Sequence, residues 1–125
     1  RAPSRLVAAE GQAPYLRLEM PLERAWQRTG AALDRLGFTV LEREREARRY
    51  TIRYAPHADE QIEQPGLLAR WLGGAERIDT APRRFRITLA QGGDGVRVAV
   101  RERSGEPAPA PIARRLLTLL DPQLY

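Results

Sequence analysis

The residues that could do chemistry in this chain are few and scattered. Its 125 residues include no cysteine and a single histidine, His57. His57 lies in the run YAPHADE beside Asp59 and Glu60, whereas a protein metal site needs three or four converging ligands. We therefore expect a solvated loop at this position, with no metal and no cofactor.

Hydroxyl groups and glycines add no catalytic signal. Four hydroxyl residues stand apart from any base in the sequence: Ser4, Thr39, Thr51 and Ser104. The run Gly92-Gly93-Asp94-Gly95 lacks the lysine and hydroxyl residue of a phosphate-binding loop and joins two strand-like segments, which predicts a hairpin turn. The sequence therefore predicts a protein that is not an enzyme.

Charge is the strongest compositional feature. The net charge is +5, all 21 basic residues are arginine, and 16 acidic residues are interspersed among them. The alternating signs from Glu42 to Glu46 indicate a solvated face rather than a nucleic-acid tract. No apolar run approaches the ~20 residues that span a bilayer.

Arginines gather on the polar side of the predicted strands. The arginines expected to share one open face are Arg53, Arg84, Arg86, Arg97 and Arg101. One interpretation is a solvated face whose ion pairs with Glu19, Glu42 and Glu44 contribute under ~1 kcal/mol each. The other is a docking surface for an acidic partner or for anionic lipid head groups.

An apolar patch is expected within the irregular segment from residue 55 to 83. The run LLARWLGG places Leu67, Leu68, Trp71 and Leu72 on one short helical piece. This piece either folds over the open end of the core or stays exposed and binds a partner, since tryptophan is favoured at binding hot spots.

Hydrophobic periodicity predicts the elements that position these residues. Residues 1 to 13 have no period, and we expect a tail or linker there. Alternation from Tyr15 to Met20 predicts a half-buried strand. A helix with an apolar stripe should begin at Pro21 and end at Gly37.

Further strands and a second helix follow. Strands are predicted at residues 38 to 43 and 50 to 54, and on both sides of the turn at residues 91 to 95. A final leucine-rich helix should stop at Pro122. The strands are apolar on one face only, so the order β-α-β-β-β-β-α predicts an α+β fold, an antiparallel sheet with both helices on one face. The expected core consists of Leu16, Leu18, Leu22, Trp26, Leu33, Phe38, Val40, Ile52, Phe85, Ile87, Val98, Val100, Ile112, Leu116 and Leu120.

Several stretches together resemble one family: PLERAWQRTGAALDRLGFTVLERERE, YTIRY, RFRITLAQGGDGVRVAV and APIARRLLTLLDPQL. They are similar to BamC, the NlpB-type lipoprotein subunit of the machinery that inserts β-barrels into the outer membrane of Gram-negative bacteria. Residues 14 to 125 look like the C-terminal of the two helix-grip domains in that family. One departure is the turn before YTIRY, where the family has a small residue or glycine and this chain has Ala47 and Arg48.

The resemblance implies a non-catalytic interaction domain that works in the periplasm. It implies other subunits of the barrel-assembly complex as partners, and anchoring to the outer membrane through a lipid-bearing cysteine upstream of Arg1.

Two other functions are compatible with parts of the sequence. One is a helix-grip carrier of a small apolar ligand, whose groove would be walled by Ile112, Leu116, Leu119, Tyr50 and Tyr54. The other is nucleic-acid binding through the arginine face. Because the exposed strand positions offer almost no aromatic side chain for base stacking, we expect no nucleic-acid partner.

Overall fold

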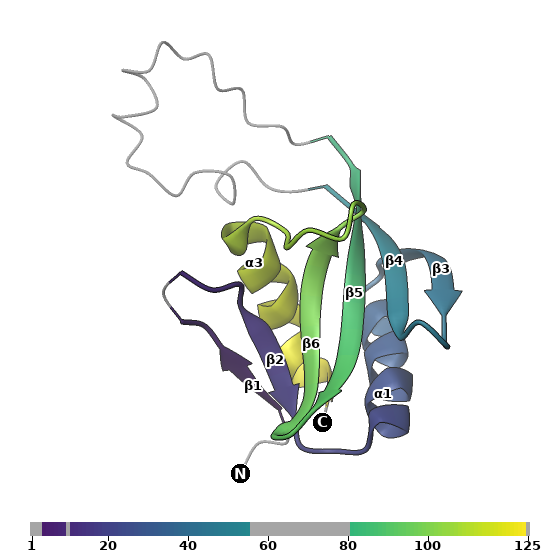
Figure 1. Ribbon diagram of the computed structural model, residues 1–125. Coiled ribbons are helices and arrows are strands. Elements are labelled where there is room, and N and C mark those ends of the chain that lie inside the picture. The colour runs from purple at the N-terminus through teal and green to yellow at the C-terminus, as the bar shows by residue number, and fades with distance from the viewer. Residues whose placement is uncertain (1–3, 10, 56–80, 125) are drawn as a thin grey trace.

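The computed structural model describes residues 4–9, 11–55 and 81–124. Within these ranges, a six-stranded sheet carries both helices on one face, as Figure 1 shows with the sheet in front of them. The elements are β1 (Ser4–Val7), β2 (Tyr15–Leu18), α1 (Leu22–Arg35), β3 (Thr39–Glu44), β4 (Arg49–Tyr54), β5 (Arg83–Gly92), β6 (Gly95–Glu102), α3 (Ala110–Leu120) and the 3₁₀ helix η2 (Asp121–Leu124).

The strand order is β1-β2-β6-β5-β4-β3, and every neighbouring pair is antiparallel. Helix α1 therefore connects β2 to the strand at the opposite edge of the sheet. Its start at Pro21 and its end near Gly37, which adopts φ +81°, are as the sequence predicted. The α+β class and the placement of both helices on one face are confirmed.

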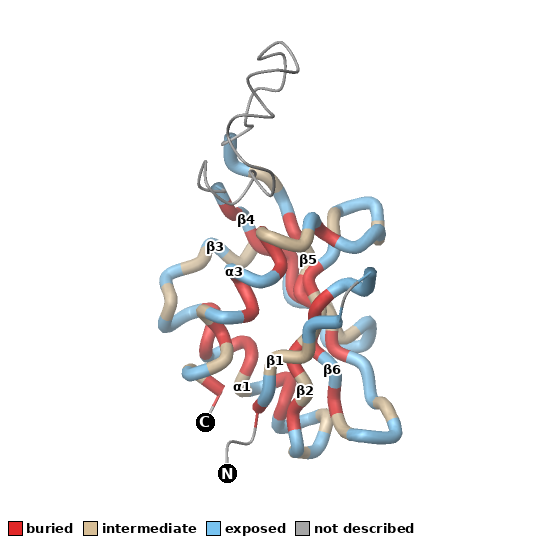
Figure 2. Tube along the Cα trace, turned by 90° about the vertical axis from the view of Figure 1, so that its left-hand side faces the viewer, coloured by how far each residue is buried: buried red, intermediate tan, exposed pale blue. Residues whose placement is uncertain are grey.

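The core lies between the sheet and the two helices, where buried residues concentrate in Figure 2. The expected core residues are buried there, except that Leu22, Phe38 and Val40 are half-buried and pack against its margin. Leu89 and Val96 belong to the same alternation on β5 and β6, and both are buried as well. The open face of the sheet carries the polar half of the same alternation.

The N-terminal segment corrects one prediction. Residues 1 to 13 were expected to be a tail, yet Ser4–Val7 forms β1 and pairs with β2 in the register Ser4↔Leu18 and Leu6↔Leu16. A strand of four residues is too short to be recognised from hydrophobic alternation. Its conformation depends on pairing with β2. The Ser4 hydroxyl also donates a hydrogen bond to the carboxylate of Asp121.

The C-terminus adds a turn beyond the predicted final helix. Helix α3 ends before Pro122, but the chain continues as η2 and buries Leu124 completely. Two arginines of α1 hold this turn. Arg28 donates to the carbonyl of Leu124 at 3.4 Å, and Arg35 donates to that of Gln123 at 3.2 Å.

The turns of the β5–β6 and β3–β4 hairpins differ in backbone geometry. Between β5 and β6, Gly92 pairs with Gly95, so the glycine-rich run is a hairpin turn as predicted. A Cβ on Gly95, at φ +126°, would lie 2.5 Å from the carbonyl oxygen of Leu18. Between β3 and β4, Arg48 adopts φ 55°, and the register shifts between Val40 and Glu42, which marks a β-bulge.

One contact ties β4 to α1 within the core. The Tyr50 ring stacks on Trp26 with centroids 4.0 Å apart, and its hydroxyl donates to the Trp26 carbonyl at 2.6 Å. Burial raises the pKa of Tyr50 to about 12. A Cβ on Gly30 would lie 2.5 Å from that hydroxyl, so only glycine leaves room for it.

Candidate docking surface on the open sheet face

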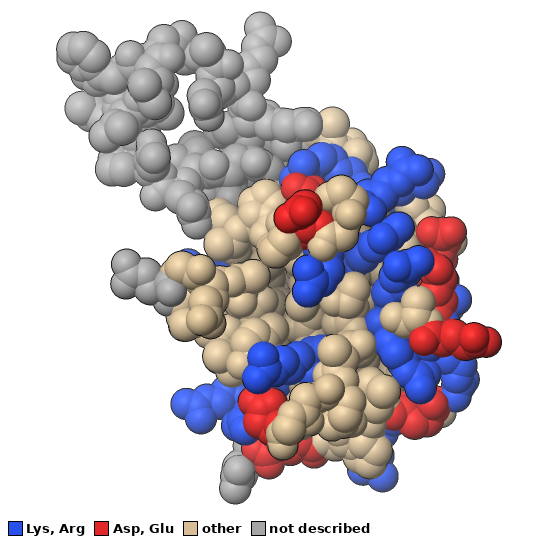
Figure 3. All heavy atoms as spheres, in the orientation of Figure 1, with Lys and Arg blue, Asp and Glu red and all other residues tan. Residues whose placement is uncertain are grey.

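Arginines occupy matching positions on neighbouring strands of the open face. The paired positions are Arg5↔Arg17, Arg17↔Arg97, Arg86↔Arg101 and Arg53↔Arg84. We call these pairs the arginine rows. Figure 3, which views this face, shows basic side chains spread over the middle of the sheet. All five arginines that the sequence placed on this face are in the rows.

The arginine rows are only partly neutralised. Arg17 lies 3.6 Å from the carboxylate of Glu19, and Arg97 lies 3.4 Å from that of Asp94. Arg53, Arg84 and Arg86 have no ion-pair partner within the described ranges. Like charges directly opposite each other in a sheet are destabilising, so these pairs are unfavourable in the isolated domain.

Two further acidic side chains of this face, Glu42 and Glu44, lie at the β3 margin. Glu44 accepts two hydrogen bonds of 2.9 Å from the guanidinium of Arg49. The hydrogen bond from Arg49 lowers the pKa of the Glu44 carboxyl, and the charge of Arg86 adds to the effect. Glu42 lies one row away, opposite Thr51. The face is therefore basic over its central strands and mixed in charge at β3.

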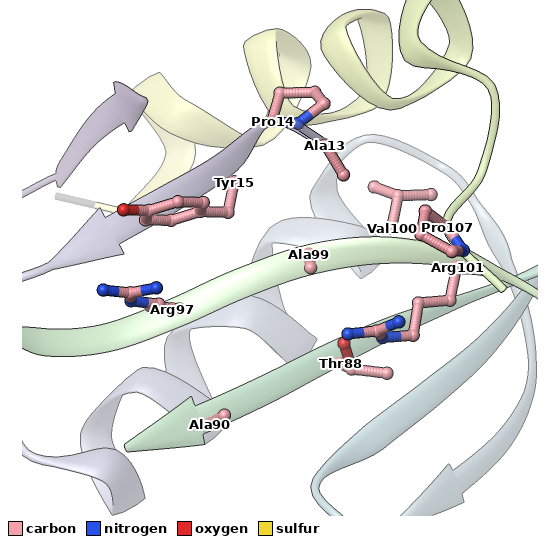
Figure 4. A pocket seen from close by; sticks show the side chains of 10 residues that line it. All are labelled: Ala13, Pro14, Tyr15, Thr88, Ala90, Arg97, Ala99, Val100, Arg101 and Pro107. Atoms are coloured by element: carbon pink, nitrogen blue, oxygen red, sulfur yellow. The ribbon is translucent and has the colours of Figure 1, made fainter. Parts of the chain in front are cut away.

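A shallow trough crosses the basic part of the face. It holds about 200 Å³ and lies over β6, between β2 and β5. Its lining consists of Ala13, Pro14, Tyr15, Thr88, Ala90, Arg97, Ala99, Val100, Arg101 and Pro107. We call it the Ala99 trough, because that small side chain lies at its centre in Figure 4, with Arg97 and Arg101 at its two ends.

The walls of the Ala99 trough come from segments far apart in sequence. Tyr15 opens β2, and the guanidinium carbon of Arg97 lies 4.6 Å from the centre of its ring. Pro107 is brought against the end of β6 by a bridge to Arg101. Sequence reasoning missed this trough. Its only sequence signal is the small residue Ala99 between two arginines, and the walls need the pairing of three strands.

The other predicted sites are placed differently. Trp71, Leu67, Leu68 and His57 lie outside the described residues. Of the five residues proposed to wall a groove beneath the last helix, Leu119 is half-buried, and the other four pack in the core. Ile112 and Leu116 are fully buried in the core, Tyr50 stacks on Trp26, and Tyr54 packs against Phe38 and Phe85.

The described residues form neither a metal-binding cluster nor a membrane-spanning helix. Among the described residues, no three side chains of histidine, cysteine, aspartate or glutamate are grouped so that they could hold a metal ion. No helix in that part of the chain is both long and apolar enough to cross a membrane.

Comparison with known proteins identifies the family of this chain. Residues 4–124 match the family model described as the outer membrane protein assembly factor BamC-like C-terminal domain. The chain is 34% identical over 112 residues to a protein from Thiobacillus denitrificans named outer membrane protein assembly factor BamC, and 32% identical over 111 residues to one of the same name from Accumulibacter regalis. Each alignment covers 87% of this chain but only 30% and 29% of the relatives, so the chain spans about three-tenths of their length. The chain belongs to the family of BamC-like C-terminal domains.

Proposed function

We propose that this chain is a non-catalytic docking domain of an outer-membrane protein assembly factor, accessory to the insertion of β-barrel proteins. Its partners are other subunits of the barrel-assembly complex, and the whole protein is held at the outer membrane by a lipid anchor, with this domain in the periplasm. The family match and the names of the two relatives support this role.

The arginine rows are the observation that carries the docking function. Arg53 and Arg84 stand opposite each other, as do Arg86 and Arg101, although such pairs are unfavourable in the isolated sheet. A partner with carboxylates on its surface removes that repulsion. The planar guanidinium group is also suited to bidentate hydrogen bonds with carboxylates. We therefore assign the arginine rows to an acidic protein surface.

The rival functions have less support in the geometry. A carrier of a small apolar ligand needs an open groove beneath α3, but Ile112 and Leu116 are fully buried in the core. A nucleic-acid-binding face needs aromatic side chains for base stacking. Among the described residues of the open face, Tyr15 is the only aromatic one, and Arg97 packs on its ring.

A pulldown with the immobilised 125-residue chain tests the proposal. Detergent-solubilised outer membranes are passed over the chain at low ionic strength, and retained subunits are identified by mass spectrometry. We expect the barrel-assembly subunits to be retained, and to be lost when Arg53, Arg84 and Arg86 are each replaced by glutamate.

The matched control reverses charge on the helical side of the molecule. Arg24→Glu, Arg114→Glu and Arg115→Glu reverse the same number of charges at exposed residues of α1 and α3, away from the open face. Retention of the subunits by this control and not by the open-face variant supports the proposal. No retention by the unmodified chain, or equal loss in both variants, contradicts it.

A further inference from the structure

The spacing of three residues on β6 defines what the Ala99 trough can accept. Arg97, Ala99 and Arg101 alternate with the buried Val98 and Val100, so all three side chains lie on the open face. In a strand, residues i and i+4 are separated by about 13 Å. Two guanidinium groups thus stand at the ends of the trough, and the methyl group of Ala99 leaves the space between them open (Figure 4).

The size and lining of the space suit one apolar side chain. Small-molecule sites usually enclose about 300–1,000 Å³, whereas this trough holds about 200 Å³. Ala90 and Thr88 border it on the β5 side, and Pro14 and Tyr15 border it on the β2 side. These surfaces are mainly apolar, while the ends are cationic.

We propose that the Ala99 trough binds an extended acidic segment of a partner protein, in which one apolar residue is flanked two positions away on each side by a carboxylate. In an extended chain, residues i, i+2 and i+4 project from one face with the spacing of Arg97, Ala99 and Arg101. The segment has the pattern acidic-x-apolar-x-acidic. This inference rests on the proposed docking function and names the chemistry of the docked partner.

Charge complementarity selects this occupant. Arg101 donates one hydrogen bond to the carbonyl of Gly105 at 3.1 Å, which leaves most of the five N–H donors of its guanidinium free for a carboxylate. Arg97 is shared with Asp94, at 3.4 Å, and Arg17 stands opposite Arg97 in the arginine rows. The recessed apolar floor between the two charges favours a peptide anchor over a lipid head group, which has phosphate but no apolar group at that position.

Two labelled peptides of equal composition test the pattern. The first is Gly-Ser-Asp-Ser-Leu-Ser-Glu-Ser-Gly, and the second is Gly-Ser-Asp-Leu-Ser-Ser-Glu-Ser-Gly, which moves leucine to the opposite side of an extended chain. Fluorescence anisotropy with the 125-residue chain at low ionic strength gives each Kd. We expect the first peptide to bind about tenfold more tightly, because only its leucine is buried in the trough.

Variants of the chain locate the binding. Ala99→Leu fills the trough without changing any charge and should weaken the first peptide about tenfold. Arg97→Ala and Arg101→Ala should each weaken it about threefold, and Asp94→Asn should strengthen it by freeing Arg97. Arg114→Ala removes the same charge from α3 and serves as the control for net charge. Circular dichroism and the Tm show whether each variant is folded.

Three outcomes overturn the inference. These are equal Kd values for the two peptides, equal weakening by Arg114→Ala and Arg97→Ala, or binding of phosphatidylglycerol vesicles, sensitive to Arg97→Ala, by a chain that binds neither peptide. The last outcome would assign the site to lipid. The pulldown depends on Arg53, Arg84 and Arg86, whereas the peptide test depends on the Ala99 trough. The peptide test can therefore fail while the pulldown succeeds, which distinguishes the two proposals.

Discussion

The two faces of the sheet differ in burial and in charge, although adjacent residues of the same strands form them. On β5, Phe85 is fully buried under the helices, while Arg84 is exposed on the other face. The covered face joins complementary groups, such as the stacked rings of Trp26 and Tyr50. The open face instead places like charges opposite one another. We infer that the covered face provides most of the stability of the fold. The paired arginines make the open face unfavourable in the isolated domain, and an acidic partner would neutralise them.

The largest expected difference between the faces comes from truncating adjacent residues. Phe85→Ala should lower the free energy of unfolding by about 3–5 kcal/mol, because it leaves a cavity beneath the helices. Arg84→Ala should change it by less than about 0.5 kcal/mol. Urea unfolding followed by circular dichroism measures both. Comparable losses in the two variants would contradict the division between the faces.

Alkaline pH should weaken the covered face through Tyr50. The folded protein holds the Tyr50 proton with a pKa of about 12, compared with 10.0 for the unperturbed group. The free energy of unfolding is therefore at its full value below pH 10 and falls as the pH rises toward 12. Urea unfolding at a series of pH values gives the slope. The Tyr50→Phe variant should show a smaller slope, and an unchanged slope would show that other groups cause the loss.

A smaller effect is expected where Tyr50 meets α1. Alanine favours a helix by about 1 kcal/mol over glycine, but a Cβ at Gly30 would overlap the Tyr50 hydroxyl. Overpacking of this kind costs about 1–3 kcal/mol, so Gly30→Ala should be a net destabilisation measured by urea unfolding. In a Tyr50→Phe background the same change should be much better tolerated. Equal losses in both backgrounds would rule out the steric explanation.

The smallest effect is expected on the open face. Arg86 stands opposite Arg101, and its buried Nε has no hydrogen-bond partner among the described residues. Arg86→Thr should therefore raise the free energy of unfolding by about 0.2–1 kcal/mol. Thermal unfolding measures the change, and Arg86→Lys, which keeps the charge, serves as the control in the same series. A clear loss of stability in the Arg86→Thr variant would mean that the Arg86↔Arg101 pair stabilises the fold.

Local periodicity was enough to predict most of the covered face. The alternation of Phe85, Ile87 and Leu89 reports burial directly, since each residue's neighbours in sequence face the other way. The start of α1 after Pro21 also follows from local chemistry. These features were predictable because the signal and the structure lie within a few residues of each other.

Features that depend on strand pairing were not predictable. β1 is held by its register with β2 and by the bond between Ser4 and Asp121, residues 117 positions apart. The Ala99 trough requires β2, β5 and β6 together, and its floor is made of small residues that carry no pattern. The open-face arginines were predictable one by one, but their alignment into rows depends on the register.

The bulge in β3 has a consequence for how this domain can meet unfolded chains. Its register shift lies on one outer strand, which also carries Glu42, Arg43 and Glu44, while the other outer strand is only four residues long. Irregular, charged or short edges resist the addition of a foreign strand. Under the proposed function, this domain would therefore not add unpaired strands of barrel precursors to its sheet, and would contact its partners through side chains.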